Sequence, residues 1–136
     1  MSTPISDLNH LLRTLDPVLH EGVYAFACLP TGTNLRGLAP LATFQEDEGL
    51  TVVLKEEAAL ARRVPVSFRA AWITLTVQSD LQAVGLTVAV SQVLAGAGIS
   101  CNILAGVHHD HLFVPVDEGP RALGVLRELP RRGASA

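Results

Sequence analysis

The sequence predicts an α+β fold built from two similar units, each an antiparallel sheet with helices packed on one face. Three observations lead to this prediction. The 136-residue chain is 49% hydrophobic and only 17% charged, which excludes a largely disordered protein. Its second half alternates strand and helix patterns in the order β-α-β-β-α, which is typical of the ferredoxin-like arrangement. One such unit has only about 65 residues and is marginal by itself, so two units are expected to pack together.

We place the N-terminal unit at residues 1–66 and the C-terminal unit at 67–130, followed by a flexible tail at 131–136. The two halves show no strong repeat of individual residues. The duplication is therefore inferred from the order of their elements, and the units either share one sheet or place two sheets side by side.

The first half is expected to contain two short helices and three strands. Ser6 or Asp7 can cap a helix that ends before Pro17. Runs of β-favouring residues bounded by turn residues then predict the strands. The expected elements are strands at 23–29, 41–45 and 50–54, a loop at 31–40 and a helix at 55–63.

The second half has clearer periodicity. Leu86, Val90 and Leu94 recur at helical spacing, and Gly98 is a suitable residue to end that helix. Asp117 is expected to cap the last helix. The expected elements are strands at 69–77, 101–106 and 111–116, a turn at 108–110, and helices at 85–97 and 119–129.

The composition excludes several classes of protein. The net charge of −3 argues against a broad basic surface for nucleic acid. No apolar run reaches the roughly 18–20 residues that span a bilayer, and the N-terminus lacks the pattern of a secretory signal. Cys28 and Cys101 form no disulfide framework, and each lies in an apolar run, which favours a buried, unreactive thiol. We expect a cytoplasmic protein with reduced thiols.

Gly85 stands where a loop passes into the predicted helix of the second half. Glycine allows a ligand to approach the backbone, and the first N–H groups of a helix favour a carboxylate. Val84, Gly85 and Leu86 are therefore a candidate site for the carboxylate of an amino acid. Alternatively, Gly85 only permits close packing of the helix on the sheet.

Two polar residues precede this loop. The carboxylate of Asp80 could accept an ammonium group, with Ser79 beside it. The alternative is a local role, because Ser79 and Gln82 have the spacing of a capping box.

The second half of the chain resembles the ACT domain in several short runs of residues. The runs that carry the resemblance are 73–77, Ser79, 83–87, 98–99, 109–111 and 113–115, and the first half matches the same group at 22–26, 42–44 and 48–54. More narrowly, the chain resembles small bacterial tandem ACT-like proteins, which are similar to the arginine-sensing CASTOR proteins of animals. The resemblance implies two packed ACT-like units that bind amino acids or other small metabolites and have no catalytic activity.

The sequence departs from the family pattern at one point, and the resemblance also suggests one further site residue. Val107 and His108 stand where many relatives carry aromatic side chains, which leaves the identity of the ligand open. In an ACT-like sheet, Asp110 begins a strand that faces the Gly85 loop. This makes Asp110 a candidate contact for an amino or guanidinium group.

Two further polar clusters allow more than one interpretation. The histidines at 108, 109 and 111 surround Asp110 and suit a hairpin turn, but His109 could contact a small molecule, and the cluster could bind zinc or nickel. The acidic run at 46–48 suits a solvated turn. It could recognise a cationic ligand only if Thr43 and Glu46 face the cleft between the units.

The sequence shows no nucleophile elbow, phosphate-binding loop or dinucleotide fingerprint, so we predict neither an enzyme nor a bound cofactor or metal. The predicted function is a regulatory sensor that binds a small molecule, an amino acid in particular. It would act through a regulated protein partner or through a homo-oligomer, without nucleic acid or membrane. The alternatives are an assembly module with a vestigial pocket and a metal-dependent enzyme that uses the cluster from His108 to His111.

Overall fold

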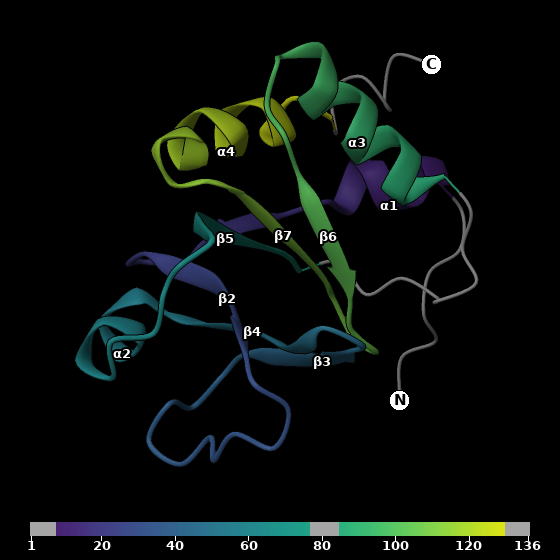
Figure 1. Cartoon of the computed structure of the whole chain (residues 1–136). Coiled ribbons are helices and arrows are strands. Elements are labelled where there is room, and N and C mark those ends of the chain that lie inside the picture. Colours follow the sequence, from purple (N-terminus) through teal and green to yellow (C-terminus); the bar gives the residue numbers. More distant parts are fainter. Residues whose placement is uncertain (1–7, 77–84, 130–136) are drawn as a thin grey trace.

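A computed structural model describes residues 8–76 and 85–129 of the chain (Figure 1). The helices are α1 (Leu8–Thr14), α2 (Glu56–Ala61), α3 (Leu86–Gly96) and α4 (Gly119–Arg127), with a short 3-10 helix at Val116–Glu118. The strands are β1 (Pro17–Leu19), β2 (Tyr24–Leu29), β3 (Ala42–Glu46), β4 (Gly49–Lys55), β5 (Phe68–Leu75), β6 (Asn102–Ala105) and β7 (Asp110–Pro115). None of the helices in these residues has the length and apolar character needed to cross a membrane.

The seven strands form one sheet in which all pairs are antiparallel. Its order is β3-β4-β2-β5-β7-β6, and β1 also pairs with β5. Figure 1 shows α1, α3 and α4 gathered together over the second half of the chain, with α2 apart beside β2 and β4. The predicted α+β, ferredoxin-like class is confirmed.

Strand β5 belongs to both halves of the sheet. Its first residues pair with β2, where Ala70 lies opposite Tyr24, and its last residues pair with β1, where Leu75 lies opposite Pro17. A β-α-β-β-α-β unit needs a final strand beside its first one, and β1 occupies that place for the second half. The sequence analysis missed β1, because three residues are too few to show alternation. The expected boundary between residues 66 and 67 stays a prediction.

The face of the sheet that carries the helices is packed with aliphatic side chains. One cluster joins α1, β5, α3, β7 and α4, and it includes Leu12 and Leu15 from the start of the chain. The second cluster joins β2, β4 and α2, with Leu38 from the loop at 30–41 almost fully buried in it. That loop replaces the first helix of the first unit, and the Arg62 guanidinium donates to the Arg36 carbonyl at 2.7 Å to hold it.

The opposite face of the sheet carries the aromatic side chains, and we call it the aromatic face. Its register places Phe26 opposite Phe68, and Trp72 opposite Phe113. The face comprises Tyr24, Phe26, Phe44, Phe68, Trp72 and Phe113, which are all the Phe, Tyr and Trp residues of the chain. Strand alternation accounts for this separation, because the neighbours of Phe26, Trp72 and Phe113 along their strands belong to the two aliphatic clusters. On the aromatic face itself, Val53, Ala70 and Phe113 form a third buried cluster.

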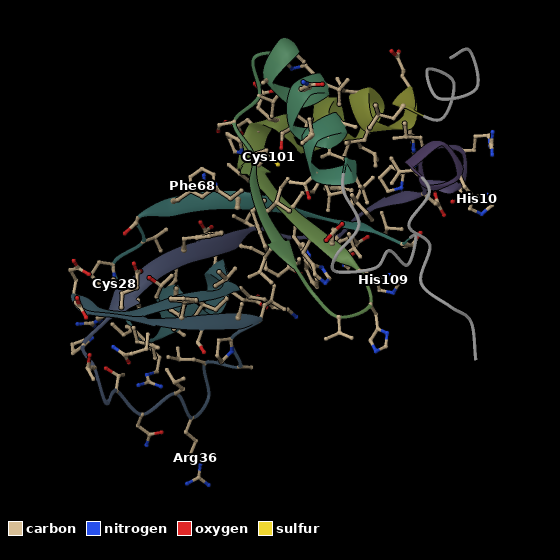
Figure 2. All side chains as sticks on the ribbon, turned by 90° about the vertical axis from the view of Figure 1, so that its right-hand side faces the viewer. His10, Cys28, Arg36, Phe68, Cys101 and His109 are labelled. Carbon is tan, nitrogen blue, oxygen red and sulfur yellow. The ribbon has the colours of Figure 1, made fainter. Side chains whose placement is uncertain are left out.

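Two local predictions were wrong. Cys28 is exposed, because Ala27 and Leu29 point to the aliphatic cluster and alternation turns Cys28 to the other face (Figure 2). Asp117 does not cap α4, because it lies inside the 3-10 helix and Glu118 takes the N-cap position without a side-chain cap. Cys101 is half-buried, and burial raises the pKa of its thiol to about 11, which agrees with an unreactive thiol. The proposed caps Ser6 and Asp7 and the tail at 131–136 lie outside the described residues.

Candidate functional site

A small cavity lies between the start of α3 and the neighbouring strands. The space is closed in this structure, and no part of it is wide enough to admit a water molecule. The wall is formed by Leu75, Leu86, Thr87, Val90, Ile103, Asp110 and Leu112. Thr87 and Asp110 are the polar members of this wall, and the other described lining residues are apolar.

Gly85 directly precedes the cavity residue Leu86 and begins α3. Its φ of 109° lies in the left-handed region, where a side chain would be strained, and this explains why glycine stands here. Its carbonyl accepts the first helical hydrogen bond, from the N–H of Ala89 at 2.8 Å. The first turn of α3 contains no acidic residue. The helix start therefore brings backbone donors and a partial positive charge close to the cavity, which suits a carboxylate.

Asp110 is the first residue of β7 and is paired with Leu75 on one side and Ala105 on the other. It lines the cavity together with Leu86. The fold thus places two of the predicted site residues, Leu86 and Asp110, around one space, with Gly85 next to them. The side chain of Leu86 is buried in the core, so its contribution to a ligand would come from its backbone. Ser79, Asp80 and Val84 lie outside the described residues.

His109 lies in the tight β6–β7 hairpin (Figure 2). Its carbonyl accepts from the N–H of Gly106 at 2.9 Å, and a Cβ on Gly106 would lie 2.9 Å from the same oxygen. Its Nδ1 is buried and has no hydrogen-bond partner among the described residues. Within residues 8–76 and 85–129, no three His, Cys, Asp or Glu side chains come together in a way that could hold a metal ion.

Thr43 and Glu46 lie on β3, at the far edge of the sheet from β6 and β7. Thr43 is opposite the core residue Val52, whereas Glu46 lies on the aromatic side and accepts a hydrogen bond from the Thr51 hydroxyl. Both side chains are exposed. The structure therefore does not bring them together with each other or with the α3 cavity.

The sequence analysis missed a polar network on the aromatic face behind this cavity. The indole N–H of Trp72 donates to Nδ1 of His111 at 3.1 Å, and the Thr74 hydroxyl oxygen lies 3.1 Å from the same nitrogen. That oxygen is also 2.7 Å from Nε2 of His20, whose ring stacks on Trp72 with centroids 3.5 Å apart. The partners are 37 to 54 residues apart in sequence, so no local motif reveals them.

This network opposes protonation of both imidazoles. Burial lowers the pKa of His20, and the charge of His111 adds to the effect. Burial also lowers the pKa of His111 and His109 adds to it, while Asp110 acts in the opposite direction. A proton on Nδ1 of His111 would face the N–H of Trp72, so that two donors would meet. Tyr24, the other titratable group beside the network, packs edge-on against Trp72.

The network predicts that the protein loses stability in mild acid. Both pKa values lie below the ordinary value of 6.5, so the unfolded chain binds more protons. The stabilisation that comes from keeping both histidines neutral in the folded protein is complete above pH 6.5. It is lost as the pH falls from 6.5 toward the pKa values of the folded protein. Urea unfolding between about pH 7.5 and pH 5 measures this loss. A double variant, His20→Gln with His111→Gln, should show a smaller pH dependence, and an unchanged dependence would contradict the assignment.

Comparison with known proteins identifies the family. Sequence models described as the ACT domain match residues 3–71 and residues 67–128. The chain belongs to the ACT domain family. It contains two ACT domains in tandem, and the two matches overlap in the first part of β5, the strand that both halves of the sheet use. ACT domains are regulatory rather than catalytic, and they typically bind small molecules.

Solved structures show the same tandem ACT fold. A Vibrio cholerae protein of unknown function, VC0802, described as a possible transport protein, is 42% identical over 90% of this chain and 95% of that one, with a TM-score of 0.83. The Agrobacterium tumefaciens protein Atu0741 is 17% identical, covering 85% and 89%, with a TM-score of 0.65. The regulatory subunit of aspartate kinase from Thermus thermophilus is 12% identical, covering 83% and 95%, with a TM-score of 0.61. No curated protein sequence matches the chain.

Proposed function

We propose that the protein is a cytoplasmic sensor that binds a small amino acid at the start of α3, where the closed space would open to admit it, and passes the signal to a protein partner or through a homo-oligomer. One observation carries the proposal: Leu86 and Asp110 line one cavity, and Gly85 begins α3 beside it. An amino acid has the two charges that this arrangement complements. Its carboxylate would meet the N–H groups at the start of α3, and its ammonium group would meet the carboxylate of Asp110.

The cavity also supports a preference among amino acids. Leu75, Val90, Ile103 and Leu112 make most of its wall apolar, and a ligand must displace side chains to enter, because the space is closed in this structure. A short aliphatic side chain would require the smallest displacement, whereas a guanidinium group would leave its donors facing apolar side chains. Membership of the ACT domain family supports a small molecule as the ligand, and within the proposed class of amino acids the apolar wall favours alanine- to valine-sized members.

The mode of action is proposed from the family. ACT domains are regulatory, and a regulatory subunit of aspartate kinase has the same fold, which supports regulation of a protein partner. Ligand binding at the start of α3 would directly affect the packing of α4 and β5, because all three contribute to one aliphatic cluster. A ligand that favours one arrangement of this cluster would shift how the protein meets its partner.

A thermal-shift screen with each of the twenty amino acids tests the proposed function. A ligand present at 100 times its dissociation constant adds about 2.7 kcal/mol of stability, which corresponds to roughly 6–12 °C for a domain of this size. We expect a shift from one or a few small aliphatic amino acids. If none of the twenty shifts the melting temperature at millimolar concentration, the amino-acid sensor is wrong and the assembly module with a vestigial pocket is favoured.

Two carboxylate variants then locate the site. Asp110→Asn keeps the shape of the side chain but removes the charge, so the affinity for the amino acid found in the screen should fall about 10–100-fold. Glu48→Gln is the matched control, since Glu48 is exposed in the turn between β3 and β4. Equal affinity in both variants, measured by calorimetry, would move the site away from Asp110.

A further inference from the structure

Two segments of the first half bring three arginines together beside α2. Arg36 lies in the loop at 30–41, and Arg62 and Arg63 directly follow α2. The Arg62 guanidinium joins the two segments, because it donates to the Arg36 carbonyl at 2.7 Å and to the Asn34 carbonyl at 3.3 Å. All three arginines are exposed, and Figure 2 shows the Arg36 side chain pointing away from the protein. We call these three residues the arginine patch.

The positive charge of the arginine patch is not neutralised within the described residues. Hydrogen bonds to carbonyl groups leave a guanidinium charged, and the ion pairs in the described part of the chain involve other arginines. The segments around the patch, residues 22–45 and 58–68, contain no Asp or Glu. The chain as a whole has 13 acidic and 10 basic residues. A chain with net negative charge thus keeps one local surface positive, which favours a negatively charged partner.

Arg63 occupies a backbone position that favours glycine. Its φ is 55°, which lies in the left-handed region. The N–H of Arg63 donates to the Leu60 carbonyl at 3.1 Å, and the N–H of Val64 donates to the Ala59 carbonyl at 2.8 Å. These two hydrogen bonds form the Schellman motif at the end of α2, in which glycine is the usual residue at this position. Backbone conformation therefore does not account for an arginine here, and the charged side chain is what glycine would lack.

An exposed apolar side chain accompanies the arginine patch. Leu60 is 64% exposed near the end of α2, three residues before Arg63. Protein interfaces combine apolar contacts with charged groups at their rim. An acidic protein segment that also carries an apolar side chain would use both features of this surface. A nucleic-acid strand would use the charges alone and would leave Leu60 in water.

We propose that the arginine patch and Leu60 bind an acidic, amphipathic segment of a protein partner. The proposal rests on the partner part of the proposed function and gives that partner a chemistry. The patch belongs to the first half of the chain, whereas the closed space at the start of α3 belongs to the second half. Substitutions in the patch should leave the thermal shift by an amino acid unchanged, so docking and amino-acid binding can fail independently.

Fluorescence anisotropy with two labelled synthetic peptides tests the proposal. Both peptides have about 14 residues with Leu at every third or fourth position, so each forms an amphipathic helix. One peptide carries Glu at the remaining charged positions, and the other carries Lys. We expect the Glu peptide to bind the full chain with a dissociation constant of about 10–500 µM at low salt, at least about 10-fold tighter than the Lys peptide. Added salt should weaken this binding, because it screens exposed charges.

Two pairs of substitutions locate the binding surface. Arg36→Gln with Arg63→Gly removes two charges from the patch and should weaken binding of the Glu peptide about 5–20-fold. The melting temperature should stay the same or rise, because glycine is favoured at the second position. Arg13→Gln with Arg127→Gln is the matched control, since it removes the same charge from exposed residues of α1 and α4. Leu60→Ser should also weaken binding, about 3–10-fold, through loss of the apolar contact.

Three results would overturn the proposal. The first is the absence of saturable binding of the Glu peptide up to about 1 mM. The second is an equal loss of affinity in the patch pair and the control pair. The third is tighter binding of a uridine oligonucleotide of about 12 nucleotides than of the Glu peptide, which would assign the patch to a nucleic acid.

Discussion

Replacing Gly49 by alanine is expected to lower the free energy of unfolding by about 2–5 kcal/mol, because two penalties add. The φ of Gly49 is 151°, which strains an alanine. A Cβ at this position would lie 2.6 Å from the Leu29 carbonyl oxygen and 2.9 Å from Sγ of Cys28. The Leu29 backbone cannot move away cheaply, since β2 is paired with β4 along its whole length. Urea unfolding followed by circular dichroism measures the loss.

Gly124→Ala is the matched control for that substitution. Gly124 lies inside α4, and a Cβ there would meet nothing within 4 Å. Alanine is the better helix former, so this variant should gain up to about 1 kcal/mol. The same substitution thus stabilises one site and destabilises the other. If both variants lost a similar amount of stability, the close contact around Gly49 would not be the cause.

Replacing Leu15 by alanine is expected to cost about 2–4 kcal/mol, although this residue lies in the short connection between α1 and β1. Leu15 is 6% exposed and packs in the same aliphatic cluster as Leu94, Leu112 and Leu126 from the second half. Its removal leaves a cavity under α3 and α4. Differential scanning calorimetry or urea unfolding measures this loss.

Val18→Ala provides the comparison for Leu15. Val18 lies on β1 and is 41% exposed, so its truncation should cost less than about 1 kcal/mol. Similar small losses for both variants would mean that the first part of the chain is not a component of the second core.

Local patterns predicted the elements that have several turns or alternations. The helical spacing of Leu86, Val90 and Leu94 was sufficient for α3, and turn residues separated most strands. The same patterns could not predict β1, since its three residues depend on pairing with β5 for their conformation. The exposure of Cys28 also depends on which face of β2 the helices cover, and the sequence of that strand alone does not show this.

The candidate site was predictable to a different degree. The backbone conformation of Gly85 follows from local chemistry, because only glycine adopts its φ easily. Asp110 came from the resemblance to ACT domains, since its place beside Leu86 depends on how β7 pairs with β5. The network of His20, Trp72 and His111 was missed, because three distant strands must assemble before these side chains meet.

The place of β1 has a consequence for synthesis on the ribosome. Residues 17–19 are synthesised before their partners on β5, residues 73–75, which follow more than fifty residues later. Leu12 and Leu15 reach their native contacts later still, since α3 and α4 complete the cluster that covers them. The nascent N-terminal segment must therefore remain without its native contacts while the first half folds. Strand β1 and helix α4 then complete the packing of this half together.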